Sequence, residues 1–358
     1  MERPLCVVFS DAFAYGSYMR LGGMREGFSV KKIKPGIGYS SNLHYLLFDG
    51  KSPDEVGFFT DYAWREFNGN ATVGAFWRKC DEIEVLNVLT RVARRTITKK
   101  TDNIPFSEKR YFSLTGKYKF MQTGDCSVFG QQAVKVYEKN TDQGFAKAMA
   151  CISSGLKKVV VVLEELDHAG HDVGSSGKRY MDGARNILQK SRELFARFTE
   201  MYPDGLCVLI SDHGMSNVIC GVDVLTGIKR EFGMPGVSYQ IYNDSIYLRV
   251  WSAEPETLQA LQSYLSGISV MDEITLQERT EYGVCARSAG DLIFRLKEGY
   301  AFDPNCFGVA VRGGCKGLHG YMEASDAASG ILVTSEPIHG GGMIDAREVY
   351  QAVASLIE

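Results

Sequence analysis

Three short apolar segments of this chain are each followed by acidic residues, and in two cases also by histidine. Strands are predicted over residues 5–9, 157–163 and 206–210, because continuous β-branched and aliphatic runs are typical of strands buried on both faces. Open α/β sheets place their ligands beyond the carboxyl ends of such strands. A solvated loop with a helix cap is the alternative for any one of these segments. The polar residues that follow the three runs are Asp11, Asp167, His171, Asp212 and His213.

The segments between and after these strands predict helices that cover the sheet. Residues 184–201 repeat apolar side chains at helical spacing and are expected to form a crossover helix between two parallel strands. Residues 330–338 predict a last strand, and residues 345–358 predict its closing helix. The pattern indicates an α/β fold with a doubly wound, mostly parallel sheet sandwiched by helices.

Two regions interrupt this alternation within what is otherwise expected to be a single domain over residues 1–358. Residues 58–141 are aromatic-rich and weakly periodic, which favours an insertion lying over the carboxyl edge of the sheet. Residues 238–314 contain an alternating strand (245–251), a capped helix (254–267) and two further strands within 291–302, which indicates a small α+β cap subdomain.

Composition excludes several classes of partner. The formal net charge of −3 is spread along the chain without a long basic block, so no nucleic-acid polymer is expected as a partner. No segment reaches membrane-spanning length, so we expect no membrane association, and the apolar run near the first residue is too short for a signal peptide. We therefore expect a cytoplasmic protein. The nine cysteines include no CxxC pair, which argues against a disulfide framework and a thiolate zinc site.

The acidic and histidine residues fall into two possible ligand sets for metal ions. Carboxylate oxygens with imidazole nitrogens are the donors that bind zinc or manganese. Asp11, Asp212 and His213 form one set, and Asp167 with His171 and a later histidine form the other. The later histidine is sought in GLHGY, where glycines flank His319, and His339 in PIHGGGM is the alternative.

In their order along the chain, five elements resemble the alkaline phosphatase superfamily, in its nucleotide pyrophosphatase/phosphodiesterase branch. These are Asp11, the stretch YSSNLHYLLFDGKSPDEVG, the D-x-x-G-H that ends at His171, the DHGM that follows residue 211, and the HGY that begins at His319. That branch has a Thr or Ser nucleophile followed at fixed distances by glycine, proline and glycine. Ser40 stands ten residues before Gly50, thirteen before Pro53 and seventeen before Gly57, and this spacing favours Ser40 over Ser41.

The resemblance implies an alkaline-phosphatase-like fold with two divalent metal ions, zinc or alternatively manganese. One ion would be bound by Asp11, Asp212, His213 and the Ser40 oxygen, and the other by Asp167, His171 and His319. The resemblance also matches His44 to a histidine usual in the nucleophile segment, to which we assign a structural role.

The activity implied is hydrolysis of phosphodiester or pyrophosphate bonds through a phosphoryl-serine intermediate on Ser40. The substrate would be a small-molecule phosphate ester, nucleotide-linked or a glycoconjugate. A phosphomonoesterase or phosphomutase of the same superfamily is an alternative, and so is a metal-bound binding protein without turnover. Ser40 argues against the last, because a pure binder has no need of a nucleophile.

Two departures from the pattern affect the substrate-binding residues. Ser40 is followed by Ser41 and Asn42 instead of the usual T-x-P arrangement. The branch has an asparagine that donates to the phosphate about twenty residues after the nucleophile, whereas this chain has Asp61 nearby, which would repel a phosphate. Asn42 and Thr60 are therefore the candidate substrate-binding residues; a residue of the insertion is an alternative donor, and a substrate other than simple nucleotides is the alternative explanation.

Overall fold

The chain divides into two compact units in a computed structural model. The first unit comprises Met1–Val56, Lys117–Asn217 and Cys315–Glu358, and the second comprises Gly57–Gly116 and Val218–Gly314. The structure describes residues 3–24, 26–57, 59–66, 83, 86, 104–114, 133–306 and 315–357. Much of the insertion predicted over residues 58–141 therefore lies outside the described residues, and its position over the sheet edge stays a prediction.

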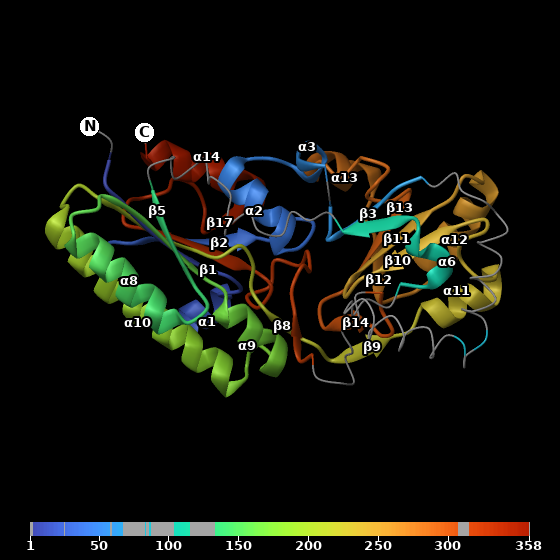
Figure 1. Cartoon of the computed structure of the whole chain (residues 1–358), viewed down its shortest axis with the longest axis horizontal. Coiled ribbons are helices and arrows are strands. Elements are labelled where there is room, and N and C mark those ends of the chain that lie inside the picture. The colour runs from blue at the N-terminus through green and yellow to red at the C-terminus, as the bar shows by residue number, and fades with distance from the viewer. Residues whose placement is uncertain are drawn as a thin grey trace. The chain divides into compact units, whose positions relative to one another are not determined.

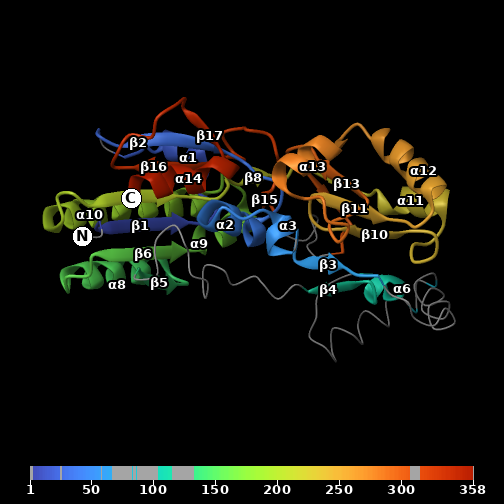
Figure 2. The same cartoon turned by 90° about the horizontal axis from the view of Figure 1, so that it is seen from above.

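The described residues of the first unit form a seven-stranded, mostly parallel sheet in the order β17-β2-β16-β7-β1-β6-β5 (Figure 2). β1 runs parallel to β6 and β7, β5 parallel to β6, and β17 parallel to β2, whereas β16 is antiparallel to both of its neighbours. The strands are β1 (Leu5–Ser10), β2 (Ser29–Lys34), β5 (Val134–Glu138), β6 (Lys158–Leu163), β7 (Leu206–Ile210), β16 (Gly330–Thr334) and β17 (Met343–Asp345).

The three predicted strands form the centre of this sheet as β1, β6 and β7. Their register aligns Phe9 with Val162 on one side and with Ile210 on the other. The three strands therefore end at one level, and the residues that follow them begin at the same edge of the sheet. β5 lies within the range predicted as an insertion, yet it is an edge strand of this sheet, and its partly exposed, short sequence shows little of a buried strand pattern.

Helices cover both faces of the sheet (Figure 1). α1 (Tyr15–Arg20), α8 (Thr141–Ser153) and α10 (Lys178–Met201) pack on one face, and α2 (Ser40–Asp49) and α14 (Ala346–Ile357) pack on the other. The predicted crossover helix forms the greater part of α10. The structure thus confirms the predicted fold class. Within the described residues, no helix combines the length and apolarity needed to span a membrane.

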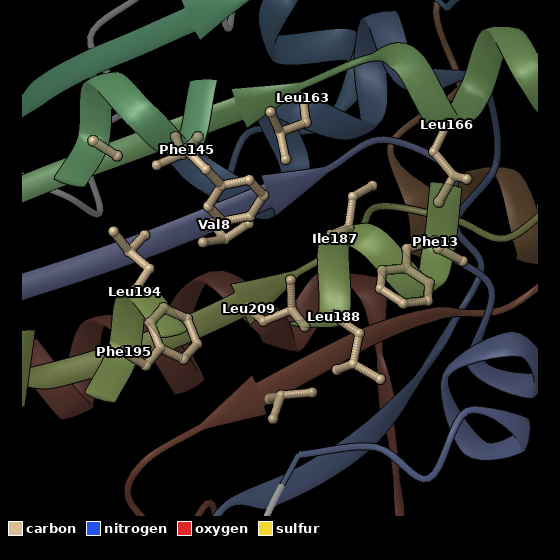
Figure 3. Close-up of a cluster of buried hydrophobic side chains, with 14 of the residues drawn as sticks. Val8, Phe13, Phe145, Leu163, Leu166, Ile187, Leu188, Leu194, Phe195 and Leu209 are labelled. Carbon is tan, nitrogen blue, oxygen red and sulfur yellow. The ribbon is translucent and has the colours of Figure 1, made fainter. Parts of the chain in front are cut away.

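Side chains from both layers interlock in the core on the α10 face (Figure 3). Val8, Leu163 and Leu209 of the three central strands point toward Ile187 and Phe195 of α10. All five are buried. Burying one such side chain contributes roughly 1.5–3 kcal/mol, so the sheet and this helix form a stable base for the loops at the strand ends.

Several short elements belong to the first unit as well. α9 (Glu165–Val173) follows β6 directly. β8 (Ser216–Asn217) follows β7 after a few residues and pairs antiparallel with β15 (Gly317–Leu318). This small ribbon joins two segments that are about one hundred residues apart in the sequence. The short helix α3 (Pro53–Val56) follows α2.

The second unit is built on a four-stranded antiparallel sheet in the order β10-β11-β13-β12. The predicted strand of the cap corresponds to β11 (Tyr247–Trp251), and its predicted helix corresponds to α12 (Pro255–Ser266). The two later predicted strands are β13 (Leu292–Leu296) and β14 (Tyr300–Phe302). β14 pairs with β9 (Cys220–Val222). Its elements are β3 (Tyr62–Trp64), α6 (Phe106–Lys109), β4 (Phe112–Leu114), β9 (Cys220–Val222), α11 (Leu225–Phe232), β10 (Gln240–Asn243), β11 (Tyr247–Trp251), α12 (Pro255–Ser266), β12 (Met271–Glu273), α13 (Leu276–Tyr282), β13 (Leu292–Leu296) and β14 (Tyr300–Phe302).

Candidate active site

The loops after β1 and β7 bring Asp11, Asp212 and His213 together. Their potential ligand atoms all lie within 4.8 Å of one another, and all three residues are buried. Nε2 of His213 is 3.3 Å from Oδ1 of Asp11 and 3.3 Å from Oδ2 of Asp212. The parallel pairing of β1 with β7 produces this meeting, because both loops start at the same level of the sheet.

Ser40 is the first residue of α2, and its hydroxyl points into this group. Oγ of Ser40 lies 2.8 Å from Nε2 of His213. The other ring nitrogen of His213, Nδ1, is 2.8 Å from the carbonyl oxygen of Gly214, to which it can only donate. In the form of the ring that can bind a metal, Nε2 therefore carries the lone pair, and this nitrogen lies near both the hydroxyl and the two carboxylates.

Asp167 and His171 project from α9 one helical turn apart. Nε2 of His171 is 3.4 Å from Oδ1 of Asp167. Nδ1 of His171 donates to the carbonyl of Gly317, at 2.8 Å. This arrangement again directs Nε2 toward the carboxylate. A backbone partner for the second ring nitrogen is the usual feature of a metal-binding histidine.

His319 joins the two groups through the ribbon of β8 and β15. Nε2 of His319 lies 3.7 Å from Oδ1 of Asp167, and Asp167, His213 and His319 form a second group with ligand atoms within 4.8 Å. The strand can approach α9 because Gly317 has no side chain: a Cβ at that position would lie 2.5 Å from the carbonyl oxygen of Gly170.

The charges of this cluster act on one another strongly. Burial and the neighbouring carboxylates of Asp212 and Asp167 raise the pKa of Asp11 well above its usual range. Burial favours a higher pKa at Asp212 too, but His213 and His44 hold that pKa below its usual value. Three acidic side chains in so small a buried volume therefore need positive charge between them.

The two histidines of the second predicted ligand set, His171 and His319, differ in their charge. Burial lowers the pKa of His171, but the Asp167 carboxylate, the Cys315 side chain and the Gly317 carbonyl together outweigh burial and raise the pKa to about 9. Burial, together with His213 and His171, holds the pKa of His319 well below its usual value, so this ring is neutral. A neutral imidazole is the form that binds a metal.

Several ligand atoms in the two groups are buried and lack a hydrogen-bond partner among the described residues. A buried carboxylate oxygen or ring nitrogen without a partner costs free energy, and a bound cation removes that cost. The atoms are Oδ1 of Asp11, Oδ1 of Asp167, Oδ1 of Asp212 and Nδ1 of His319. Their number and chemistry fit divalent ions that prefer mixed oxygen and nitrogen ligands.

His44 has a more definite role than the sequence indicated. Its Nε2 lies 3.1 Å from Oδ2 of Asp212, to which it donates a hydrogen bond. The ring of His44 packs edge-on against Phe9, with centroids 5.1 Å apart, and also contacts Phe48. His44 thus holds the same oxygen of Asp212 that lies 3.3 Å from Nε2 of His213.

Ser211 is a residue of this region that the sequence did not identify. Its hydroxyl donates to the carbonyl of His213 at 2.7 Å and accepts the backbone N–H of Phe13 at 2.8 Å. It thereby links the loops after β7 and β1. In the sequence, its position directly before Asp212 was the signal that could have placed Ser211 in the site.

Asn42 is buried and uses its side chain to hold the backbone before α2. Its Oδ1 accepts the N–H of Tyr39 at 2.9 Å, and its Nδ2 donates to the carbonyl of Ile37 at 3.0 Å. Gly38 has φ of 127°, and a Cβ there would lie 2.0 Å from Oδ1 of Asn42. These contacts favour a role for Asn42 in positioning Ser40.

Two other residues considered from the sequence lie elsewhere. Thr60 belongs to the second unit, where its hydroxyl is 3.5 Å from the carbonyl of Tyr62. Its predicted contact with the substrate stays a prediction. His339 is exposed in the segment between β16 and β17, and neither ligand group includes it.

Comparison with known proteins identifies relatives by structure. No protein-family model matches the sequence, and no curated protein matches it. Murine ectonucleotide pyrophosphatase/phosphodiesterase 5 superposes over 99% of this chain and 95% of its own, with a TM-score of 0.61 and 12% identity. The chain has the fold of this phosphodiesterase.

A second structure of the same murine protein, an inactive variant in complex with AMP, gives the same result. It covers 100% of this chain and 95% of its own, with a TM-score of 0.60 and 12% identity. The resemblance to the nucleotide pyrophosphatase/phosphodiesterase branch of the alkaline phosphatase superfamily is therefore confirmed at the level of the fold.

Proposed function

We propose that this chain hydrolyses phosphodiester or pyrophosphate bonds in small-molecule phosphate esters, with Ser40 as the nucleophile and two divalent metal ions as cofactors. The observation that carries the proposal is the position of the Ser40 hydroxyl. It lies 2.8 Å from Nε2 of His213, among buried carboxylates that lack partners for some of their oxygens. A structural serine has no need of such surroundings.

The site residues divide into two metal-ligand sets. Asp11, Asp212, His213 and the Ser40 oxygen would hold one ion, and Asp167, His171 and His319 the other, with zinc as the expected metal and manganese as the alternative. Such ions, when bound, favour the alkoxide form of a serine hydroxyl and neutralise negative charge on a phosphate.

The protein's own groups then define the course of the reaction. The Ser40 oxygen at the start of α2 would attack the phosphorus atom: the bond from Oγ to phosphorus forms, the bond to the leaving oxygen breaks, the hydroxyl proton passes to water, and the leaving oxygen takes up a proton from water. Water next attacks the phosphorus of the phosphoryl-serine and breaks its bond to Oγ. His213 donates through Nδ1 to Gly214, which leaves Nε2, 2.8 Å from Oγ of Ser40, as the nitrogen that would bind a metal.

The structural relatives support the substrate class. The murine protein is named a nucleotide pyrophosphatase/phosphodiesterase, and its inactive variant binds AMP, a nucleotide with a phosphate ester. A nucleotide-linked phosphodiester is therefore the first class of substrate to test on this chain, and a glycoconjugate phosphodiester is the second.

Turnover of a small substrate panel tests the proposal. The panel contains an aryl phosphodiester, an aryl phosphomonoester, a dinucleotide and a nucleotide sugar, each with added Zn²⁺ or Mn²⁺. We expect the diester and pyrophosphate substrates to be hydrolysed faster than the monoester. A monoester preference would support the phosphomonoesterase alternative, and no turnover in metal-loaded protein would support a binding role.

A further inference from the structure

Ala12, the residue after Asp11, has a left-handed backbone conformation. Its φ is 61°, and among the residues that the structure describes it is the one non-glycine residue with a positive φ. This conformation disfavours an alanine by roughly tenfold in population. Such a conformation persists only where the surrounding structure holds it, and it is typical of functional sites.

A buried tyrosine of α10 holds this turn from both sides. The hydroxyl of Tyr180 donates to the carbonyl of Ala12 at 2.6 Å and accepts the N–H of Ala14 at 3.1 Å. Tyr180 is fully buried. Burial raises the pKa of the Tyr180 phenol, although the Ala14 amide opposes the change, so the hydroxyl stays protonated and able to donate.

The flanking residues are fixed by other elements. The N–H of Asp11 donates to the carbonyl of Leu163 at 2.9 Å, and the N–H of Tyr15 donates to the carbonyl of Ser329 at 2.9 Å. A change of φ at Ala12 would alter the angle between β1 and the segment after it. The N–H of Phe13 in that segment donates to the Ser211 hydroxyl, which bonds to the carbonyl of His213, so the change would move His213 relative to the Asp11 carboxylate.

We propose that Tyr180 is a positioning residue, whose hydroxyl holds Ala12 in the left-handed conformation that directs Asp11 Oδ1 toward Nε2 of His213. This inference rests on the proposed metal-dependent function and deepens it, because it names what fixes one ligand of the first metal. The effect passes through the backbone, since Tyr180 bonds to Ala12 and Ala14.

The first test compares two tyrosine variants by their affinity for zinc. Tyr180→Phe removes the hydroxyl and keeps the ring. Tyr18→Phe is the matched control, because Tyr18 is buried in the same hydrophobic cluster and its hydroxyl accepts the N–H of Met24 at 2.8 Å, in a different loop. In competition with a chromophoric chelator, Tyr180→Phe is expected to lose at least tenfold in Zn²⁺ affinity at one site, and Tyr18→Phe less than twofold. Zinc affinity of Tyr180→Phe equal to wild type would overturn the proposal.

The second test uses glycine to remove the strain. Glycine adopts a φ near 61° freely, so Ala12→Gly alone should bind zinc like the wild type. The double variant Ala12→Gly/Tyr180→Phe should bind Zn²⁺ about tenfold more tightly than Tyr180→Phe alone. This factor equals the roughly tenfold population penalty that the left-handed conformation imposes on alanine. A double variant as weak as Tyr180→Phe would show that the hydroxyl does not act through Ala12, and would overturn the proposal.

The readouts separate this inference from the proposed reaction. Zinc affinity is measured without substrate, so a chain that shows the predicted coupling but hydrolyses no ester contradicts the reaction and supports the role of Tyr180. If the wild type turns over substrate normally but the Tyr180 variants do not show the predicted change in zinc affinity, only the role of Tyr180 is contradicted, and the proposed reaction stands. If Tyr180→Phe does not fold, thermal unfolding of metal-free Ala12→Gly decides: a midpoint above wild type supports the strain at Ala12, and one below it overturns the proposal.

Discussion

The imidazole rings of His213 and His319 stack face to face, with centroids 3.8 Å apart and planes within 5° of each other. His213 belongs to the set expected to hold one ion, and His319 to the set expected to hold the other. Burial and the neighbouring His213 keep His319 neutral, so the stack does not bring two positive rings together. The two ligand sets are therefore physically joined, and we expect changes in one to affect the other.

The purified protein should contain about two transition-metal ions per chain. The buried carboxylates of Asp11 and Asp212 and the partly buried carboxylate of Asp167 act on one another and need cations between them. Chelation should abolish turnover and lower the midpoint of thermal unfolding, since an ion that binds the folded state stabilises it. Elemental analysis of a folded, active sample that finds neither zinc nor manganese would rule out this cofactor assignment.

Asp167→Ala and His319→Ala should each empty the second metal position. Asp167 lies in α9, whose Leu166 packs in the apolar core, and His319 directly follows β15; neither side chain belongs to that core, so the fold should remain. His339→Ala is the matched control. His339 is exposed, so this variant should keep both ions. Metal content of the three variants decides the matter. If His339→Ala loses an ion and His319→Ala keeps both, the assignment of the last histidine ligand is wrong.

His44 should matter for metal binding through its hydrogen bond to Asp212. His44→Phe keeps a ring against Phe9 and removes the donor, and we expect a loss of about 10–100-fold in affinity for the first metal. His44→Gln retains an N–H donor and should recover part of that loss. Equal zinc affinity in His44→Phe and the wild type would leave His44 with the packing role that the sequence suggested.

Asn42→Ala should lower stability more than it changes substrate affinity. The side chain bonds to the backbone of Tyr39 and Ile37, and loss of such a bond at a helix start costs about 0.5–2 kcal/mol. Denaturant unfolding measures the first effect, and KM with an aryl phosphodiester measures the second. A large rise in KM with unchanged stability would instead support the direct contact with substrate predicted from the sequence.

The arrangement of the sheet was predictable because its signal is local. Continuous apolar runs identify β1, β6 and β7, and acidic residues shortly after them mark the edge where ligands gather. The spacing of Asp167 and His171 by four residues likewise predicts a shared direction from one helical turn. Each of these inferences uses only residues within a few positions of one another.

Other features depend on contacts between distant segments. His319 reaches Asp167 through the two-residue strands β8 and β15, which are too short to carry a periodic pattern. The choice between His319 and His339 therefore required the motif HGY as well as the flanking glycines. Tyr180 holds a residue 168 positions away, and nothing near it in the sequence indicates that role. The pairing of β14 with β9 is another contact of this kind.

The central claim is that Ser40 is the nucleophile, and a covalent adduct tests it most directly. The enzyme is quenched during turnover of an aryl phosphodiester, and peptide mass spectrometry locates any phosphoryl or phosphoryl-ester group. We predict an adduct on Ser40, with Ser40→Ala slower by about a thousandfold or more while both metals remain bound. Ser41→Ala, the neighbouring control, should change turnover little. An adduct on Ser41, or full activity in Ser40→Ala, would contradict the account.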